Sequence, residues 1–210
     1  MKSEVERHYD EISEDYDKNI NLYCQKRFFA IVKKFSKGKV LEVGCGTGLI
    51  QNKLKGVVGV DITLSMLEKN KNDAVCADAH SIPFKDGIFD AVYSIDVIEH
   101  VKNPGKMVDE CRRVLKKNGT LVLITPNGDM EVALDIAEKL KLKLPEGPHK
   151  FLRFGELVNL AKKYDFEILS AERFVLFPKE FWPVTRMFEN LEKILPYFCL
   201  FSCVVARKIS

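Results

Sequence analysis

The sequence lacks the marks of several common protein classes. Its six cysteines include no Cys-x-x-Cys pair and join no cluster with histidine, so no cysteine–histidine metal site is expected. No apolar run reaches the roughly 18 residues that a membrane-spanning helix needs. The 33 basic and 30 acidic residues leave a net charge of only +3. Because nucleic-acid binding needs clustered lysine and arginine side chains, no nucleic-acid partner is expected.

The sequence also shows no recognisable targeting segment. The first residues, Met1-Lys2-Ser3-Glu4, do not resemble a signal peptide. Four cysteines lie in apolar runs, where a free thiol packs as a small apolar side chain. These features predict a reducing, cytoplasmic location. A chain of 210 residues suits one large domain better than two.

From residue 39 onward, strand-like and helix-like segments alternate. Such alternation of continuous apolar strands with helices is typical of parallel βαβ units whose sheet is covered on both faces. Residues 1–36 predict two helices, the second with an apolar stripe that we assign to the core. The strands are predicted at 39–43, 57–61, 74–77, 89–95, 120–125, 166–170 and 198–206. The later helices are predicted at 47–55, 63–70, 104–118, 127–140 and 153–163.

A glycine-rich segment, Glu42-Val43-Gly44-Cys45-Gly46-Thr47-Gly48, follows the first predicted strand. Glycine permits positive φ and lets a ligand approach the backbone, because no Cβ stands in the way. Exposed N–H groups at the start of the following helix would hold an anionic group. A tight strand-to-helix turn can use glycine without any ligand, so this segment alone indicates only a nucleotide-like partner.

Two carboxylates narrow the choice of ligand. Asp61 ends the second predicted strand, seventeen positions beyond Gly44, where a carboxylate can accept two hydrogen bonds from a ribose diol. Asp78 follows the third strand and could accept from the exocyclic amine of a purine. Either residue could instead only cap a turn. The dinucleotide fingerprint needs a third glycine where Leu49 stands, and no Tyr-x-x-x-Lys is present. S-adenosylmethionine is therefore favoured over a nicotinamide cofactor, and a nicotinamide-dependent reductase is the alternative enzyme.

Several ordered stretches across residues 39–126 resemble the class I S-adenosylmethionine-dependent methyltransferases, specifically their ubiquinone/menaquinone-type ("type 11") group. The matching stretches are VLEVGCGTG (40–48), GVD (59–61), ADAHSIPF (77–84), FDAV (89–92), VIEHV (97–101) and LKKNGT (115–120). The resemblance implies an α/β fold with a Rossmann-like, doubly wound, seven-stranded sheet. Its strand order would be 3-2-1-4-5-7-6, with strand 7 antiparallel. We expect a single domain over 1–210, divided into an N-terminal helical lid (1–36), a cofactor-binding core (37–126) and an acceptor side with a C-terminal hairpin (127–210).

The same resemblance implies an enzyme that uses S-adenosylmethionine and releases S-adenosylhomocysteine. Gly44 and Gly46 would contact the methionine part of the cofactor and Asp61 the ribose. Tyr9 and Tyr16 would belong to a lid that closes over the cofactor, unless they are ordinary surface aromatics. The full predicted cofactor set is Glu42, Gly44, Cys45, Gly46, Asp61, Ile62, Asp78, Ala79, Ser94 and Tyr16.

Methyl transfer from a sulfonium requires alignment of the acceptor, exclusion of water and removal of one proton. Asp96 should face the donor, and His100 is the candidate base, unless it is only a helix-start residue. His149 could line the acceptor pocket or simply pack in its loop. Glu99 and His100 suggest a metal site, but no third ligand is evident, so no metal is predicted.

The segment 174–197 is unusually apolar and aromatic. It could cover a lipophilic acceptor or make a peripheral membrane contact. Alternatively, it packs on the core or forms a dimer interface, so both a monomer and a homodimer stay open. We expect a small-molecule acceptor, such as a lipophilic or quinone-like hydroxyl compound. The alternative from another class is a catalytically silent module that binds the cofactor and scaffolds a partner.

Overall fold

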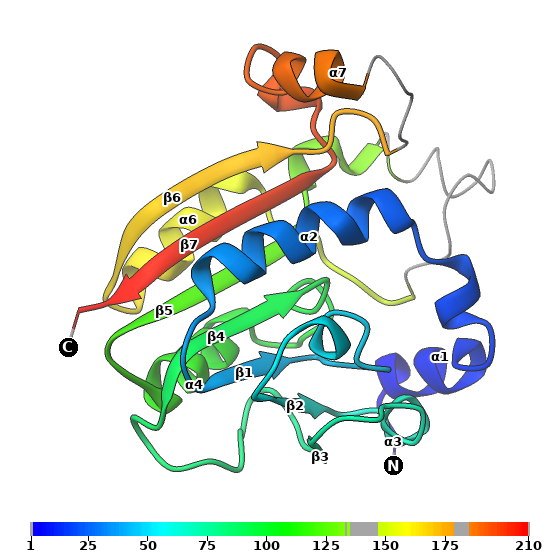
Figure 1. Ribbon diagram of the computed structural model, residues 1–210, viewed down its shortest axis with the longest axis vertical. Helices are drawn as coiled ribbons and strands as arrows, with labels where there is room; N and C mark the ends of the chain where they lie inside the picture. The colour runs from blue at the N-terminus through cyan, green and yellow to red at the C-terminus, as the bar shows by residue number, and fades with distance from the viewer. Residues whose placement is uncertain (1, 133, 135–146, 179–184, 210) are drawn as a thin grey trace.

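The computed structural model describes residues 2–132, 134, 147–178 and 185–209 (Figure 1). Its centre is a seven-stranded sheet of order β3-β2-β1-β4-β5-β7-β6, which is the predicted order. The first five strands pair in parallel, and β7 runs antiparallel to β5 and β6. The strands are β1 (Val40–Val43), β2 (Val57–Asp61), β3 (Ala74–Cys76), β4 (Phe89–Ile95), β5 (Leu115–Pro126), β6 (Phe166–Phe174) and β7 (Phe201–Lys208).

Helices cover both faces of this sheet (Figure 1). The α-helices are α1 (Glu4–Ile12), α2 (Leu22–Phe35), α3 (Leu64–Leu67), α4 (Pro104–Val114), α6 (Phe154–Lys163) and α7 (Thr185–Leu191). Short 3₁₀ helices are η1 (Tyr16–Asn19), η2 (Gln51–Lys53), η3 (Gly128–Met130) and η4 (Pro196–Phe198). Helix α4 begins where Asn103-Pro104 predicts, because the Asn103 side chain accepts the N–H of Lys106 and proline suits the first turn.

Two apolar clusters hold the helices to the sheet. On one face, Phe28 and Val32 of α2 are buried against Tyr93 of β4, which confirms the core assignment of the apolar stripe on this helix. On the other face, α4 and α6 supply buried residues such as Met107 and Leu157. Five of the six cysteines are buried free thiols, and only Cys76 is exposed. Burial of both sheet faces explains why the strands read as continuous apolar runs.

Several predicted boundaries were wrong. No α-helix follows the glycine-rich segment over 47–55, all of which is described; the chain forms only the short helix η2. Here Gly48 has a φ of +81° and donates its N–H to the Cys45 carbonyl, which closes a turn instead of starting a helix. Helix α3 ends at Leu67, short of the predicted Asn70. Most of the helix predicted at 127–140 lies outside the described residues.

The last strands are also longer or later than predicted. Strand β5 begins at Leu115, which pairs with Phe89 ahead of a bulge, and Asn118 takes a left-handed φ of 63° within it. Strand β6 continues to Phe174, and β7 starts at Phe201. Among the described residues, no helix is long and apolar enough to cross a membrane. The carboxyl ends of β1, β2 and β4 point to one edge of the sheet, where α1 and α3 lie (Figure 1).

Candidate functional site

A cavity of about 520 Å³ opens at this edge of the sheet. Its walls come from the segments that follow β1, β2, β3 and β4, with α1 as a cover. Ligands of doubly wound sheets bind at this kind of edge. The predicted site residues that line it are Gly44, Gly46, Asp61, Ile62, Asp78, Ala79, Tyr16, Asp96 and His100. Residues that the sequence interpretation missed include Thr63, Met66 and His80, which follow β2 and β3 but belong to no acidic or glycine pattern.

The glycine-rich segment forms one wall of the cavity. Gly44 and Gly46 have positive φ values of 76° and 48°. A Cβ on Gly44 would lie 2.0 Å from a methyl of Val97, so that glycine is needed for packing. A Cβ on Gly46 would meet nothing nearer than Met66 at 4.0 Å, which leaves the backbone there open to a ligand. The cavity can therefore accept a group that approaches the chain at Gly46.

The amide N–H groups of this segment are already bonded within the protein. Gly44 and Cys45 both donate to the carbonyl of Val60, and Gly46 donates to Asp61 Oδ2 at 2.8 Å. The expectation that a helix start beyond the loop presents N–H groups to an anion is therefore wrong. Because no α-helix follows Gly48, neither aligned N–H groups nor a helix dipole are present there.

Asp61 lies at the centre of the cavity wall. Its Oδ2 accepts from Gly46 and its Oδ1 accepts the N–H of Thr63, each at 2.8 Å. Both carboxylate oxygens are therefore fixed as acceptors at the cavity wall, which suits a vicinal diol as a donor. Burial raises the pKa of Asp61, although the bonds from Thr63 and Gly46 oppose this.

A second part of the cavity lies beside Ile62, Ala79 and Asp78. Asp78 is half exposed, and its Oδ1 accepts both the backbone N–H and the ring Nδ1 of His80, at 2.8 and 2.7 Å. Apolar side chains on one side and a carboxylate on the other suit a flat ring with an amine substituent.

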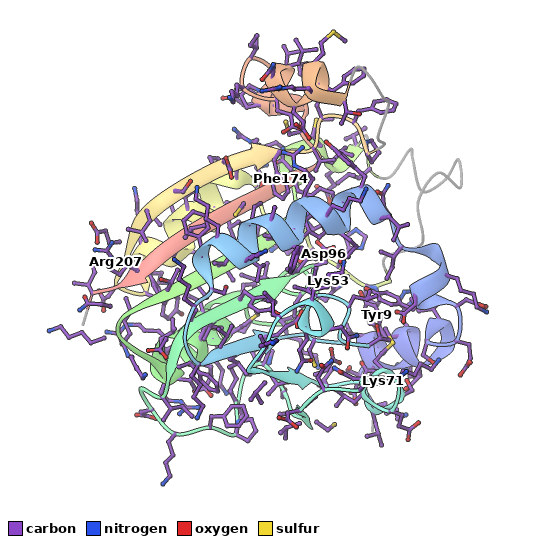
Figure 2. The ribbon with its side chains drawn as sticks, in the orientation of Figure 1. Tyr9, Lys53, Lys71, Asp96, Phe174 and Arg207 are labelled. Atoms are coloured by element: carbon purple, nitrogen blue, oxygen red, sulfur yellow. The ribbon has the colours of Figure 1, made fainter. Side chains whose placement is uncertain are left out.

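Tyr16 and Asp96 both line the cavity, close enough for the Asp96 charge to act on the Tyr16 hydroxyl. Asp96 follows β4 with a left-handed φ of 53°, an unusual conformation for aspartate that is concentrated at functional sites. Burial raises the pKa of Tyr16 strongly, and the carboxylates of Asp96, Asp61 and Asp17 raise it further. The Tyr16 hydroxyl therefore stays protonated and is surrounded by carboxylates. Tyr9 on α1 and Asp96 lie at the same edge of the sheet (Figure 2).

His100 connects the cavity to its cover. Its Nδ1 lies 2.9 Å from the carbonyl oxygen of Pro148, which can only accept, so Nδ1 carries the proton. In the neutral ring, Nε2 then accepts from the Tyr9 hydroxyl at 3.2 Å. The predicted candidate His149 lies beside His100, with ring centroids 6.3 Å apart, and packs on Phe151 at 4.1 Å. It does not line the cavity.

Three predicted cofactor residues lie behind the cavity wall. Glu42 is buried and accepts a hydrogen bond from the Tyr93 hydroxyl at 2.7 Å, and burial raises its pKa to about 8. The Sγ of Cys45 faces Gly59, and Ser94 donates to the Val43 carbonyl. These contacts support the walls from within. Within the described part of the chain, no three or more His, Cys, Asp or Glu side chains form a group that could hold a metal ion.

Polar contacts hold the cover, defined here as residues 2–19, on the cavity. Ser65 donates to Asp10 at 2.6 Å, Thr47 donates to Asp17 at 2.7 Å, and Lys69 pairs with Glu14 at 3.0 Å. No residue of helix α1 is fully buried, although the Tyr9 ring contacts those of Tyr16 and His100. The cover is thus attached to the sheet edge chiefly by hydrogen bonds and ion pairs.

The chain is similar in sequence and in fold to methyltransferases. A family model described as a methyltransferase domain matches residues 41–123. An uncharacterized protein of Methanocaldococcus jannaschii is 29% identical over 169 residues, covering 78% of this chain and 82% of the relative. The ubiquinone biosynthesis O-methyltransferase of Coxiella burnetii is 31% identical over 64% of this chain and 66% of the relative. A solved S-adenosylmethionine-dependent methyltransferase of Thermotoga maritima shares the fold, with a TM-score of 0.75, 20% identity and coverage of 95% and 97% of the two chains.

Proposed function

The chain belongs to the type 11 group of class I S-adenosylmethionine-dependent methyltransferases, and we propose that it methylates a hydroxyl group of a lipophilic, quinone-like small molecule. S-adenosylmethionine is the methyl donor of this enzyme. The hydroxyl acceptor is supported by His100, whose Nε2 lies in the cavity as a hydrogen-bond acceptor. It is also supported by the O-methyltransferase among the relatives. No observation favours a reductase or a silent scaffold.

The residues of the cavity fit the donor. The open backbone at Gly46 would receive the methionine part, and the carboxylate of Asp61 would accept from the ribose hydroxyls. Ile62 and Ala79 would flank the adenine, and Asp78 would accept from its amine. When bound, the cofactor supplies a methyl group on a positively charged sulfonium. Burial of most of a ligand in a partly apolar cavity with few polar contacts is typical of cofactor sites.

Around the reacting centre, the protein supplies negative charge and one proton acceptor. The carboxylates of Asp96 and Asp61 lie near the neutral Tyr16 hydroxyl. Their negative charge favours the binding of a cationic group in this part of the cavity. His100 Nε2 would take the proton of the acceptor hydroxyl, while Pro148 holds the ring through Nδ1. Because Nε2 has one lone pair, Tyr9 would have to give up its hydrogen bond to Nε2 when the acceptor hydroxyl binds there. The cover would exclude water.

The donor site is tested first by isothermal titration calorimetry. We expect binding of S-adenosylmethionine and S-adenosylhomocysteine but not of NAD, and a loss of roughly tenfold or more in Asp61→Asn, because an amide can accept at only one of the two positions. Asp73→Asn, at the exposed residue before β3, is the matched control. Equal donor affinity in Asp61→Asn would remove Asp61 from the site.

The acceptor is tested by release of S-adenosylhomocysteine across a panel of catechols, hydroquinones, amines and thiols. We expect turnover only with hydroxyl compounds that carry apolar substituents. His100→Asn should lower kcat by about 10²-fold or more with little effect on donor affinity. His149→Asn should lower kcat less than His100→Asn does, because the His149 ring does not line the cavity. Preferred turnover of amines would reject the hydroxyl proposal while leaving the methyl donor in place.

The tail of the chain supports a peripheral membrane contact. Ile194, Tyr197, Phe198 and Met187 are large apolar side chains that are each more than half exposed, and they lie on or beside α7 and η4. Phe181 and Trp182, which the sequence also suggests for this contact, lie outside the described residues. Sedimentation with vesicles of phosphatidylcholine and phosphatidylglycerol should pull down the protein, and Ile194→Ser with Tyr197→Ser should abolish this. Lack of binding at low salt would contradict the contact.

A further inference from the structure

The segment between β3 and β4 carries the predicted adenine-binding residues but contains no regular helix or strand. Helix α4 and the residue before it hold this segment in place. Arg113 donates to the carbonyls of Ile82 and Phe84, and Glu110 accepts the N–H of Ile82. His80 makes the remaining link to α4, through the backbone of its capping residue Asn103.

His80 lies between two polar groups that together fix the state of its ring. The N–H of Asn103 donates to Nε2 at 3.2 Å, so Nε2 must carry a lone pair. In the neutral ring the proton then lies on Nδ1, which donates to Asp78 Oδ1 at 2.7 Å. The His80 side chain is 17% exposed, whereas that of Asp78 is 50% exposed. A partly buried ring thus adds a second hydrogen bond to a half-exposed carboxylate that is otherwise held only by the backbone N–H of His80.

We propose that His80 is a positioning residue that makes the enzyme selective for a 6-amino purine over a 6-oxo purine. This inference rests on the assigned donor and concerns the same cavity, which His80 lines. Both bonds from His80, through its backbone N–H and its Nδ1, end on Asp78 Oδ1, so Oδ2 takes no part in them. A carboxylate oxygen held in one orientation accepts an amine and repels a carbonyl oxygen at the same place. His80 therefore supplies selectivity through Asp78 without touching the reacting atoms.

The hydrogen bond to Asn103 also fixes which ring nitrogen faces Asp78. Because Nε2 is occupied by the Asn103 N–H, the neutral ring has its one proton, on Nδ1, available for Asp78. A carboxylate presents acceptors only, which is what discrimination between an amine and a carbonyl requires.

The test compares S-adenosylhomocysteine with S-inosylhomocysteine, its 6-oxo analogue, by calorimetry on the full chain. The wild type should bind the amino ligand at least about tenfold more tightly, as expected for a hydrogen bond to a charged group. His80→Ala should reduce this ratio severalfold, mainly by weakening the amino ligand. His80→Asn places an amide N–H near the position of Nδ1 and should restore most of the ratio, whereas His80→Gln should not.

Two controls separate positioning from a structural role. Ser81→Ala, at the exposed neighbouring residue, should leave the ratio unchanged. If His80 only stabilised the segment, His80→Ala would weaken both ligands equally, and an unchanged ratio in a folded variant would overturn the proposal. Equal binding of the two ligands by the wild type would also overturn it while leaving the donor assignment in place. A wild type that binds neither ligand would contradict the donor itself.

Discussion

Glu42 is a buried carboxyl in the first strand, two residues before Gly44. Its Oε2 accepts from the Tyr93 hydroxyl, and its side chain lies behind the cavity wall and does not line it. Burial is the main reason that its pKa rises to about 8, against an ordinary value near 4.5, and the charge of Asp61 adds to the rise. A neutral Glu42 would support the wall without adding a second negative charge beside Asp61.

This raised pKa makes folding stability depend on pH. Below pH 4.5, Glu42 is protonated in both the folded and the unfolded chain. Between about pH 4.5 and 8, only the unfolded chain releases this proton. The free energy of unfolding therefore falls as the pH rises through this range. Glu42→Gln keeps an acceptor for Tyr93 and removes the titration. We expect it to flatten the fall of stability between pH 5.5 and 8 and to stabilise the protein at pH 8 by about 1 kcal/mol or more. Urea denaturation at both pH values measures this, and parallel pH profiles for both proteins would contradict it.

At the scale of single residues, the sequence correctly predicts cavity-lining residues that lie in a known motif and directly follow a strand. Asp61, Asp78 and Gly46 line the cavity because strand ends converge at one edge of a parallel sheet. Glu42 and Ser94 could not be placed this way, since neighbouring strand residues alternate between faces and only packing decides which one meets the cavity. His80 was not predicted because its role depends on Asn103, which is distant in the sequence. The individual ligand roles, and the division into lid, core and acceptor side, stay predictions.

At the scale of elements, α1 differs from the helices of the core. Helix α4 buries five residues, among them Met107 and Cys111, whereas α1 buries none and is stabilised by a capping box at Ser3 and Glu6. Local stability follows buried contacts, so α1 should open far more readily than α4. The structure thus separates a rigid sheet edge from a weakly attached cover.

The hydrogen bond from Ser65 to Asp10 provides a test of this cover. Ser65→Ala should speed dissociation of S-adenosylhomocysteine several-fold in stopped-flow experiments and increase hydrogen exchange in α1. The melting temperature should change by only a few degrees, because a single partly buried hydrogen bond adds about 1 kcal/mol. Ser81→Ala is the control outside the cover. Slower exchange in α1, or an unchanged dissociation rate, would argue that α1 does not gate the cavity.

The predicted elements failed where tertiary contacts override local preference. The residues after Gly48 have reasonable helix propensity, yet the turn at Gly48 and the bond from Gln51 to the Val57 carbonyl keep that connection short. Strand β5 starts early because Leu115 is fully buried and pairs with Phe89, a contact that no local pattern reveals. By contrast, the start of α4 was predicted correctly, since its cap and its proline agree. Its end was predicted too late, because the helix stops at Val114 and β5 begins at Leu115.

At the scale of the whole molecule, Arg27 joins helix α2 to the C-terminal part of the chain through ion pairs with Glu192 and Glu189. Arg27 of α2 donates to both oxygens of Glu192 at 3.0 and 2.7 Å, and Glu192 is only 6% exposed. Glu192 also accepts the N–H of Leu176. Through α2, which leads directly from the cover, this pair connects the exposed apolar tail to the N-terminal elements of the site.

Removing one member of this pair should destabilise the protein more than removing both. Arg27→Leu leaves the buried carboxylate of Glu192 without its bidentate partner, and we expect a loss of about 3 kcal/mol in urea denaturation. The double variant Arg27→Leu, Glu192→Leu should recover much of this loss, because the apolar pair needs no charge compensation. Donor affinity should change little in the double variant, since neither residue lines the cavity.

Binding to anionic vesicles separates the structural role of this pair from a role in membrane contact. If the pair only anchors the tail, the double variant should bind vesicles like the wild type, because its apolar residues around α7 are retained. Arg27→Leu alone should differ from the wild type in its affinity for vesicles, because it loses the ion pair that anchors the tail. A double variant as unstable as Arg27→Leu would show that the hydrogen bonds of Glu192 to the tail, and not its charge pairing, hold helix α2 and the C-terminal part of the chain together.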